Sequence, residues 1–199
     1  MDEFSNLEST FRSSIVRSKA LCDLQDYLAK NYSGALDSTD MLRASLVLSV
    51  SAFDYLVHEI IRIETIRRFK LKRSIDRINI PFNILNSDVS DIETRLDAHV
   101  REVNSYKSFV DPGKFSEAIG CFVSTPWEKI ATEMGISADQ IKSRVRAIYR
   151  WRNRIAHEAD INPVLSGIEL WPIDKFDVVS AIRDIEGVGL LSIKVIRDN

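Results

Sequence analysis

Glycine and proline are scarce in this sequence. Only 7 Gly and 5 Pro occur among 199 residues, about half of their combined share in an average protein. Because these residue types mark turns, their scarcity predicts few turns and long helices. Hydrophobic residues make up 45% of the chain and charged residues 28%. This balance gives a globular core and excludes disordered, collagen-like and low-complexity architectures.

Cysteine and long apolar runs are also lacking. Cys22 and Cys121 have no CxxC neighbour, which argues against a zinc site and a disulfide framework. We therefore expect a reducing cytoplasmic setting and no cofactor or metal. The N-terminus, MDEFSNLEST, is acidic and unlike a secretory signal. No uninterrupted apolar run approaches the ~18 residues of a membrane span, so we expect no membrane partner.

An excess of one charge is absent too. Lys and Arg total 27 against 29 Asp and Glu, which gives a formal net charge of -2. No global basic field therefore argues for nucleic acid. A polyanionic partner would have to be bound by local basic clusters.

Apolar residues recur at helical spacing through most of the chain. The pattern predicts helices over 2–31, 40–69, 89–109, 114–123, 126–134, 137–158 and 174–197. The second of these is apolar on more than one side, so it is expected to be the central, most buried helix. We interpret residues 1–199 as a single all-α domain.

Local signals mark the ends of these helices. Gly34 is placed where the first helix stops, residues 80–83 form a predicted loop, and the run 111–113 (Asp-Pro-Gly) is a turn that ends the third helix. Pro126 fits the first position of a helix that Gly135 follows. The last helix is predicted to begin at a cap residue, Asp174, and to be weakened by Gly187 and Gly189.

The helix over 137–158 carries an unusual residue on its apolar stripe. Ser137 and Gln140 form a capping-box pattern, and the stripe continues from the apolar positions Ile141, Val145 and Ile148. The next position on the stripe is Arg152. A guanidinium there is costly unless it is paired, hydrated or at an interface. Two interpretations stay open: Arg152 reaches solvent or a carboxylate, or it lines a cleft or subunit interface and binds a phosphate.

The residues around Arg152 resemble a known motif. The string RNRIAH, from Arg152 to His157, resembles the motif of the HEPN superfamily, in which His follows Arg within a few residues and Asn comes directly after the Arg. Two longer segments, LRASLVLSVSAFDYLVHEI and RVRAIYRWRNRIAHEADI, resemble the central and motif helices of the RiboL-PSP-like branch of that superfamily. The resemblance spans roughly residues 40–160.

The resemblance implies a fold and a chemistry. The fold would be an up-down helical bundle with additional short helices, and two copies would form a homodimer whose motifs face each other as a composite ribonuclease site. Cleavage would need no metal: His157 would act as general acid or base, Arg152 would bind the phosphate, and Asn153 would orient the reacting groups. These roles suit the chemistry of imidazole and guanidinium groups.

The implied substrate is RNA, because the attacking group is the 2'-hydroxyl that DNA lacks. The products would be a 2',3'-cyclic phosphate and a 5'-hydroxyl. The resemblance also implies a growth-arresting toxin or antiphage effector, with a neutralising antitoxin or regulatory protein as a partner. Some HEPN toxins carry a Tyr two residues after the His, which a partner enzyme modifies. Ala159 occupies that position here, so this control is not expected.

Other interpretations of the same residues remain. His157 would also stabilise the last carbonyls of a helix without any catalytic role, and Asn153 would simply be a surface residue. A HEPN fold without catalysis would serve as an RNA-binding or partner-binding dimer. Asp54 and His58, four residues apart on the central helix, either pair with each other or use Asp54 to support Arg152 or His157.

Two basic clusters are candidates for RNA binding, the alternative being solvated helix faces. In the first, arginines crowd the motif helix at positions 144, 146, 150, 152 and 154, and Arg150 and Arg154 are the predicted RNA contacts. The second follows the central helix: only Glu64 and Asp76 interrupt its basic residues, which are Arg62, Arg67, Arg68, Lys70, Lys72, Arg73 and Arg77. From this cluster Arg67, Arg68 and Lys70 are predicted to contact RNA.

A competing hypothesis concerns DNA. The segment WEKIATEMGISADQI, residues 127–141, resembles a helix-turn-helix, with Ala131, Gly135 and Ile141 at its small, turn and apolar positions. The would-be recognition helix begins with residues poorly suited to a phosphate-lined groove, 137–140 (Ser-Ala-Asp-Gln), and it continues far beyond the usual length.

Overall fold

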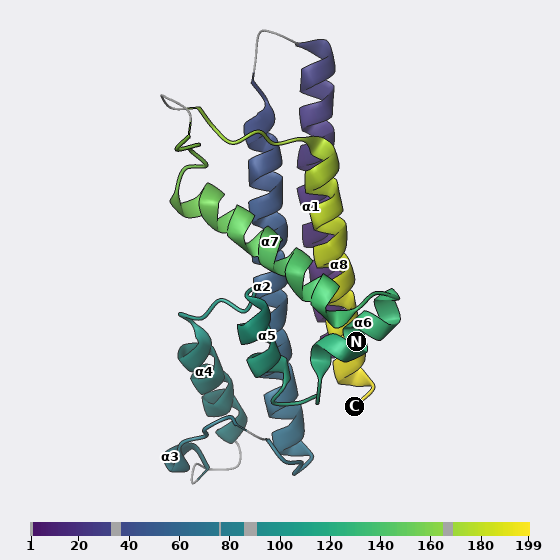
Figure 1. Cartoon of the computed structure of the whole chain (residues 1–199). Helices are drawn as coiled ribbons and strands as arrows, with labels where there is room; N and C mark the ends of the chain where they lie inside the picture. The colour runs from purple at the N-terminus through teal and green to yellow at the C-terminus, as the bar shows by residue number, and fades with distance from the viewer. Residues whose placement is uncertain (1, 33–36, 76, 86–90, 165–168) are drawn as a thin grey trace.

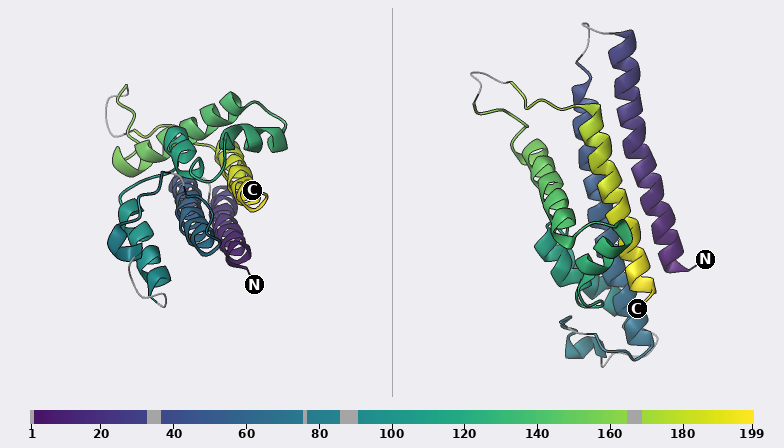
Figure 2. Two further views of the ribbon diagram at one scale, coloured as in Figure 1. Left: turned by 90° about the horizontal axis from the view of Figure 1, so that it is seen from below. Right: turned by 45° about the vertical axis from the view of Figure 1, so that its right-hand side comes forward.

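The predicted all-α fold is confirmed. The computed structural model describes all residues except 1, 33–36, 76, 86–90 and 165–168, and the described residues form eight helices and no strand. Three long helices lie side by side, α1 (Glu3–Asn31), α2 (Thr39–Lys70) and α8 (Lys175–Arg197), and α7 (Ala138–His157) crosses α2 and α8 at a slant (Figures 1 and 2). The shorter helices are α3 (Phe82–Leu85), α4 (Ile92–Asn104), α5 (Pro112–Ile119) and α6 (Pro126–Met134).

Helix α2 is the central element, as the apolar pattern predicts. It packs against α1, α4, α5, α7 and α8, and Leu46, Phe53 and Ile60 on it are fully buried. A window of 18 residues in α2 is also long and apolar enough to cross a membrane, but 56% of that window is buried inside the protein. Such burial is typical of the core helix of a helical domain. The expected absence of a membrane partner stays a prediction.

Gly189 allows α8 to approach its neighbours closely. A Cβ atom built at Gly189 would lie 2.5 Å from the ring of Phe11 on α1 and 2.9 Å from Leu56 on α2. These separations are too short for any side chain without a shift of the packed helices. Gly189 has a low helix propensity, but it permits α8 to pack closely against Phe11 on α1 and Leu56 on α2.

The helix predicted over 89–109 is shorter than expected and ends at Asn104. Two side chains of α2 hold the chain beyond it: Asp54 accepts a hydrogen bond from the backbone N–H of Phe109 at 2.7 Å, and His58 Nε2 lies 3.1 Å from the carbonyl of Lys107. These tertiary hydrogen bonds take the place of helical backbone hydrogen bonds near the end of the predicted helix. The predicted start at Val89 lies outside the described residues, as do Gly34 and Asp76.

Two further boundaries differ from the prediction. Residues 80–83, expected to be a loop, include the start of α3, because the Pro81 carbonyl accepts from Ile84 N and Ile84 is buried. Asp111 caps α5 by accepting from Gly113 N and Lys114 N, so α5 begins at Pro112 and ends at Ile119 instead of running over 114–123. The predicted helix over 126–134 is confirmed as α6, and Gly135 after it is left-handed with φ 67°.

Candidate functional site

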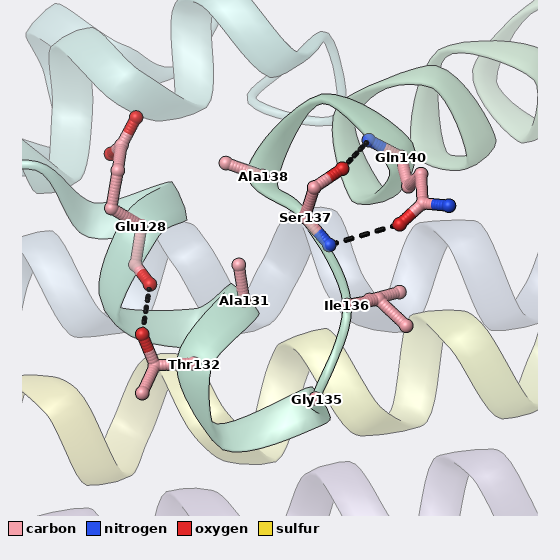
Figure 3. Close-up of a pocket in the computed structure, with 8 residues that line it drawn as sticks. All are labelled: Glu128, Ala131, Thr132, Gly135, Ile136, Ser137, Ala138 and Gln140. Atoms are coloured by element: carbon pink, nitrogen blue, oxygen red, sulfur yellow. Dashed lines mark hydrogen bonds between the residues drawn. The ribbon is translucent and has the colours of Figure 1, made fainter.

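Helix α7 begins at a complete capping box. The Ser137 N–H donates to Gln140 Oε1 at 2.9 Å, and the Gln140 N–H donates to Ser137 Oγ at 3.2 Å (Figure 3). The apolar stripe of Ile141, Val145 and Ile148 is buried, and α7 packs against α2, α5, α6 and α8. The capping box and the stripe together fix the start and rotation of the helix that carries the motif.

The motif residues occupy the last turns of α7. Arg152 and Asn153 are half-buried, and Arg152 Nη1 donates to Asn153 Oδ1 at 2.9 Å. His157 is the final residue of the helix, is exposed, and makes no hydrogen bond or ion pair with the described residues. Asn153 and His157 are four residues apart, so they lie on the same face of α7.

Two buried nitrogen atoms beside the motif lack acceptors. Within the described part of the chain, Trp151 Nε1 and Arg152 Nε are buried and have no hydrogen-bond partner. Arg152 forms no ion pair there either, so the interpretation of a salt-bridged Arg152 is not supported. A buried donor without an acceptor costs about 1–3 kcal/mol. Arg152 Nε is covered, so an acceptor from outside the chain would bind at the terminal nitrogens of Arg152, of which only Nη1 is bonded to a described residue.

The chain turns sharply directly after the motif. Ala159 and Asp160 are both left-handed, with φ 52° and 54°, a conformation that is uncommon for residues other than glycine. The side chain of Asp160 is only 1% exposed. It accepts from Arg154 Nε at 2.6 Å and from Arg43 Nε at 2.7 Å, so two guanidinium groups neutralise this carboxylate.

Arg43 ties this turn to α2. It is itself buried, and its Nη1 donates to Thr39 Oγ1 while its Nη2 donates to the carbonyl of Trp171 at 2.7 Å. The Trp171 N–H in turn donates to the carbonyl of Asp160, and the Arg154 guanidinium lies 4.8 Å from the centre of the Trp171 ring. We call Arg43, Arg154, Asp160 and Trp171 the clamp. It holds the C-terminal turn of α7 in place.

Sequence reasoning missed three members of the clamp, Arg43, Asp160 and Trp171. Arg43 and Asp160 are charged residues that look exposed in a helical pattern, and 117 residues separate them. Arg154, predicted to contact RNA, is a clamp residue in the structure. The one available signal was an arginine among the apolar residues at the start of the central helix.

Asp54 does not support the motif as proposed. Besides bonding to Phe109 N, its Oδ1 lies 4.0 Å from His58 Nε2, and it makes no hydrogen bond to Arg152 or His157 among the described residues. The His58 ring also packs against Phe109, with ring centres 4.7 Å apart. The alternative of a local Asp54–His58 pair is closer to the structure, because both side chains fix the segment between α4 and α5.

The second basic cluster, which begins within the last turns of α2, is largely paired there with residues of the same chain. Glu64 is fully buried and accepts from Arg67 Nε at 2.6 Å and from Arg68 Nε at 2.7 Å. The hydrogen bond to Glu64 raises the pKa of Arg67 above the usual arginine value. Arg68 also donates to the Phe122 carbonyl, and Lys70 pairs with Glu93 at 2.8 Å. These residues have structural partners, and their contact with RNA stays a prediction.

The basic cluster on α7 is more open. Arg144 pairs with Asp184 at 3.4 Å, whereas Arg146 and Arg150 are exposed and form no ion pair with the described residues. Arg150 lies three positions before Asn153 and seven before His157, so it is on the same face of α7 as these two motif residues. Among the predicted RNA contacts, it is exposed and has no ion pair with a described residue.

The segment resembling a helix-turn-helix forms α6, the Gly135 turn and the start of α7. A shallow hollow of about 660 Å³ lies at this turn, lined by α6 and the first residues of α7 (Figure 3). Ser137 and Gln140 are committed to the capping box, Ala131 and Ile141 are buried, and α7 extends over 20 residues across α2. In the first turn of α7, Ser137 and Gln140 are thus engaged with each other, and the exposed Asp139 carries a negative charge that DNA phosphates would repel.

A metal site was not expected from the sequence. Across the residues that the structure describes, no three His, Cys, Asp or Glu side chains are grouped so that they could hold a metal ion. The polar motif side chains at the end of α7 are the imidazole of His157, the guanidinium of Arg152 and the amide of Asn153.

Comparison with known proteins identifies the fold family. No curated protein and no solved structure shows significant similarity to the chain. A family model described as RiboL-PSP-HEPN matches residues 12–189, which includes α2, α7 and the whole clamp. The chain, with its all-α fold and its Arg-x4-His motif at the end of α7, belongs to the RiboL-PSP-HEPN family and is a HEPN-domain protein.

Proposed function

We propose that this protein is an endoribonuclease that works without a metal ion, as a homodimer whose composite site takes Arg152, Asn153 and His157 from both copies. The observation that carries the proposal is the exposed His157 at the end of α7, placed just beyond a half-buried Arg152 that pairs with no carboxylate among the described residues. Family membership supports the same conclusion, because HEPN domains are generally ribonucleases or RNA-binding domains.

The proposed reaction is an intramolecular transfer within the RNA. One His157 takes the proton of the 2'-hydroxyl, whose oxygen attacks the adjacent phosphorus and forms the 2',3'-cyclic phosphate. The bond from phosphorus to the 5'-oxygen breaks, and a protonated imidazole supplies the proton that makes the 5'-hydroxyl. Arg152 stabilises the negative charge that builds on the phosphate oxygens, and Asn153 holds Arg152 through its Oδ1.

A homodimer follows from the demands of this reaction. The base and the acid act on opposite sides of the phosphorus, and each copy offers one motif histidine. Exposed apolar residues next to the motif are suited to an interface between two copies; these are Ile161, Val164 and Leu170. The composite site would then lie where the C-terminal ends of two α7 helices meet.

The substrate strand needs further contacts to its phosphates. Arg150 is exposed beside the motif, so we assign it the role of a phosphate contact. Arg154 has a positioning role, because its bond to Asp160 in the clamp holds the end of α7. Arg67, Arg68 and Lys70 are retained as weaker candidates because Glu64 and Glu93 already pair with them. Each phosphate contact makes RNA binding weaker as salt rises.

We extend the proposal to the protein's role. A ribonuclease of this kind in the cytoplasm would arrest growth as a toxin or an antiphage effector, and a neutralising antitoxin or regulatory protein would restrain it. This extension rests on the resemblance to HEPN toxins. A partner that covers the exposed end of α7 would block both the phosphate site and the dimer.

The test is cleavage of a structured RNA pool in excess chelator. Wild type should produce 2',3'-cyclic phosphate ends, and His157→Ala should cut about a hundred- to ten-thousandfold more slowly while remaining folded by circular dichroism. Arg183→Ala is the control, since Arg183 is exposed on α8 outside both basic clusters and forms no ion pair with a described residue, and it should cut at the wild-type rate. Cleavage by His157→Ala at the wild-type rate would contradict the proposed chemistry.

The same experiment addresses the alternatives. RNA binding by wild type with no cleavage would favour a HEPN module without catalysis. Binding to duplex DNA with a sequence preference, and no cleavage of RNA, would favour the helix-turn-helix hypothesis.

A further inference from the structure

A second cavity lies apart from the motif. It has a volume of about 720 Å³ and is bounded by α2, α4, α5 and residues 77–79, and none of the motif or clamp residues lines it. Its size is within the range of small-molecule sites. The deeper wall is apolar and buried, formed by Ile61, Val100, Phe109 and Ala118.

The rim of this cavity is positively charged. Arg77, Lys107 and Lys114 line it, against a single carboxylate, Glu117. Lys114 and Arg77 are exposed and form no ion pair with the described residues. Lys107 Nζ is held by Asn104 Oδ1 at 3.0 Å. Cations concentrated at the mouth of an apolar hollow attract an anion and bind it more strongly than on an open surface.

An exposed aromatic ring stands at the same mouth. Tyr106 lines the cavity and is 81% exposed, with Lys107 Nζ 5.8 Å from its ring centre. His99 also lines the cavity, with Nε2 3.0 Å from the Asn79 carbonyl. An exposed ring next to cations can stack on a planar group whose phosphate those cations bind.

We infer that this cavity binds a nucleotide. Its planar base would lie between Tyr106 and the apolar wall, and its phosphate would lie against Lys107 and Lys114, with Arg77 within the same rim. A bare anion would make no use of the apolar wall, and an uncharged apolar ligand would make no use of the cations. The nucleotide is either free or one residue of an RNA strand, and binding of the free form does not depend on the ribonuclease activity.

Calorimetry with the full chain tests this inference. Adenosine monophosphate should bind about tenfold or more tightly than adenosine or inorganic phosphate, because only the monophosphate uses both parts of the cavity. Decanoate, an anion with an apolar tail and no ring, should bind more weakly than the monophosphate. Absence of monophosphate binding, or equal binding of decanoate, would overturn the inference.

Variants locate the site. Tyr106→Ala and Lys114→Glu should each weaken monophosphate binding about tenfold. The matched controls Tyr27→Ala and Lys129→Glu, at exposed positions outside the cavity, should leave it unchanged. Equal losses in variants and controls would place the nucleotide elsewhere and refute the assignment.

A short RNA distinguishes the two sources of the nucleotide. The comparison uses the His157→Ala protein, whose cavity is intact, and a single strand of four nucleotides. If this strand binds more tightly than the monophosphate, and Lys114→Glu weakens its binding, the cavity contacts an RNA strand. Tighter binding of the monophosphate would identify a free nucleotide. His157→Ala should bind the monophosphate as tightly as wild type does. The binding result therefore tests the cavity even if the protein does not cleave RNA.

Discussion

A single carboxylate organises the residues around the motif. Asp160 follows a left-handed turn, is buried, and accepts from Arg43 and Arg154, which come from α2 and α7. Taking a charge out of water is costly, and the arrangement is favourable only because both guanidinium groups remain paired. The position of His157, three residues earlier, thus depends on a residue that touches no substrate in the proposed reaction.

Asp160→Asn should destabilise the fold by about 3 kcal/mol, because Arg43 would lose its buried carboxylate partner and keep only the exposed Asp40, at 3.4 Å. Urea denaturation of the two proteins measures the difference. Asp26→Asn is the control, since the Asp26–Lys30 pair lies on the surface of α1 and contributes little. A loss for Asp160→Asn no larger than that of the control would show that the clamp does not stabilise the domain.

Helix ends were predictable where a short local pattern defines them. Ser137 with Gln140 marked the start of α7, and Asp174, which accepts from Asp177 N at 2.9 Å, marked the start of α8. Each of these bonds joins residues three apart, so a single sequence contains all the information. Arg152, Asn153 and His157 were identified in the same way, from adjacent residues that resemble a motif.

The contacts that sequence reasoning missed join distant segments. Asp54 bonds to Phe109 across 55 residues and Arg43 to Asp160 across 117. Periodicity describes which face of a helix is apolar, but it does not say which polar residue on that helix will meet another segment. The overlong prediction for α4 and the unforeseen bond from Phe109 to Asp54 have this one cause.

At the scale of elements, the packing of α8 gives a sharp prediction. Gly189→Ala should destabilise the protein by about 1–3 kcal/mol, because the added methyl group would overlap Phe11 and Leu56. Gly187→Ala is the matched control on the same helix: its Cβ would meet only Met134 at 3.5 Å, and alanine favours a helix by up to ~1 kcal/mol.

Thermal or urea unfolding of both glycine variants measures these effects. Opposite signs are expected, with Gly189→Ala less stable than wild type and Gly187→Ala equal or more stable. If Gly189→Ala were as stable as Gly187→Ala, the three long helices would have to be less tightly packed than the structure indicates.

At the scale of the whole molecule, the exposed apolar residues beside the motif bear on assembly. Val164 is 82% exposed, and Ile161 and Leu170 near it are joined by the isolated bridge between residues 161 and 170. Large exposed apolar side chains grouped in this way are typical of interaction surfaces. The motif and this surface share one end of the molecule, so a change that prevents the proposed dimer should also prevent the proposed reaction.

Val164→Asp should therefore convert a dimer to a monomer and lower RNA cleavage, without changing the fold. Light scattering at micromolar concentration and the chelator assay measure the two effects. Val16→Asp, at a position on α1 that is 64% exposed, is the control and should remain dimeric and active. A wild type that is monomeric at this concentration would argue strongly against a composite site.

The clamp also sets an order of events during synthesis. Arg43 donates to Asp160 and to the Trp171 carbonyl, which follow it by 117 and 128 residues. The end of α7 is fixed only when these segments have met, and contacts between such distant segments form late in folding. A nascent chain that has not yet reached Trp171 would carry every motif residue and still lack the clamp that positions them, so the proposed ribonuclease should become active only after synthesis has passed that residue.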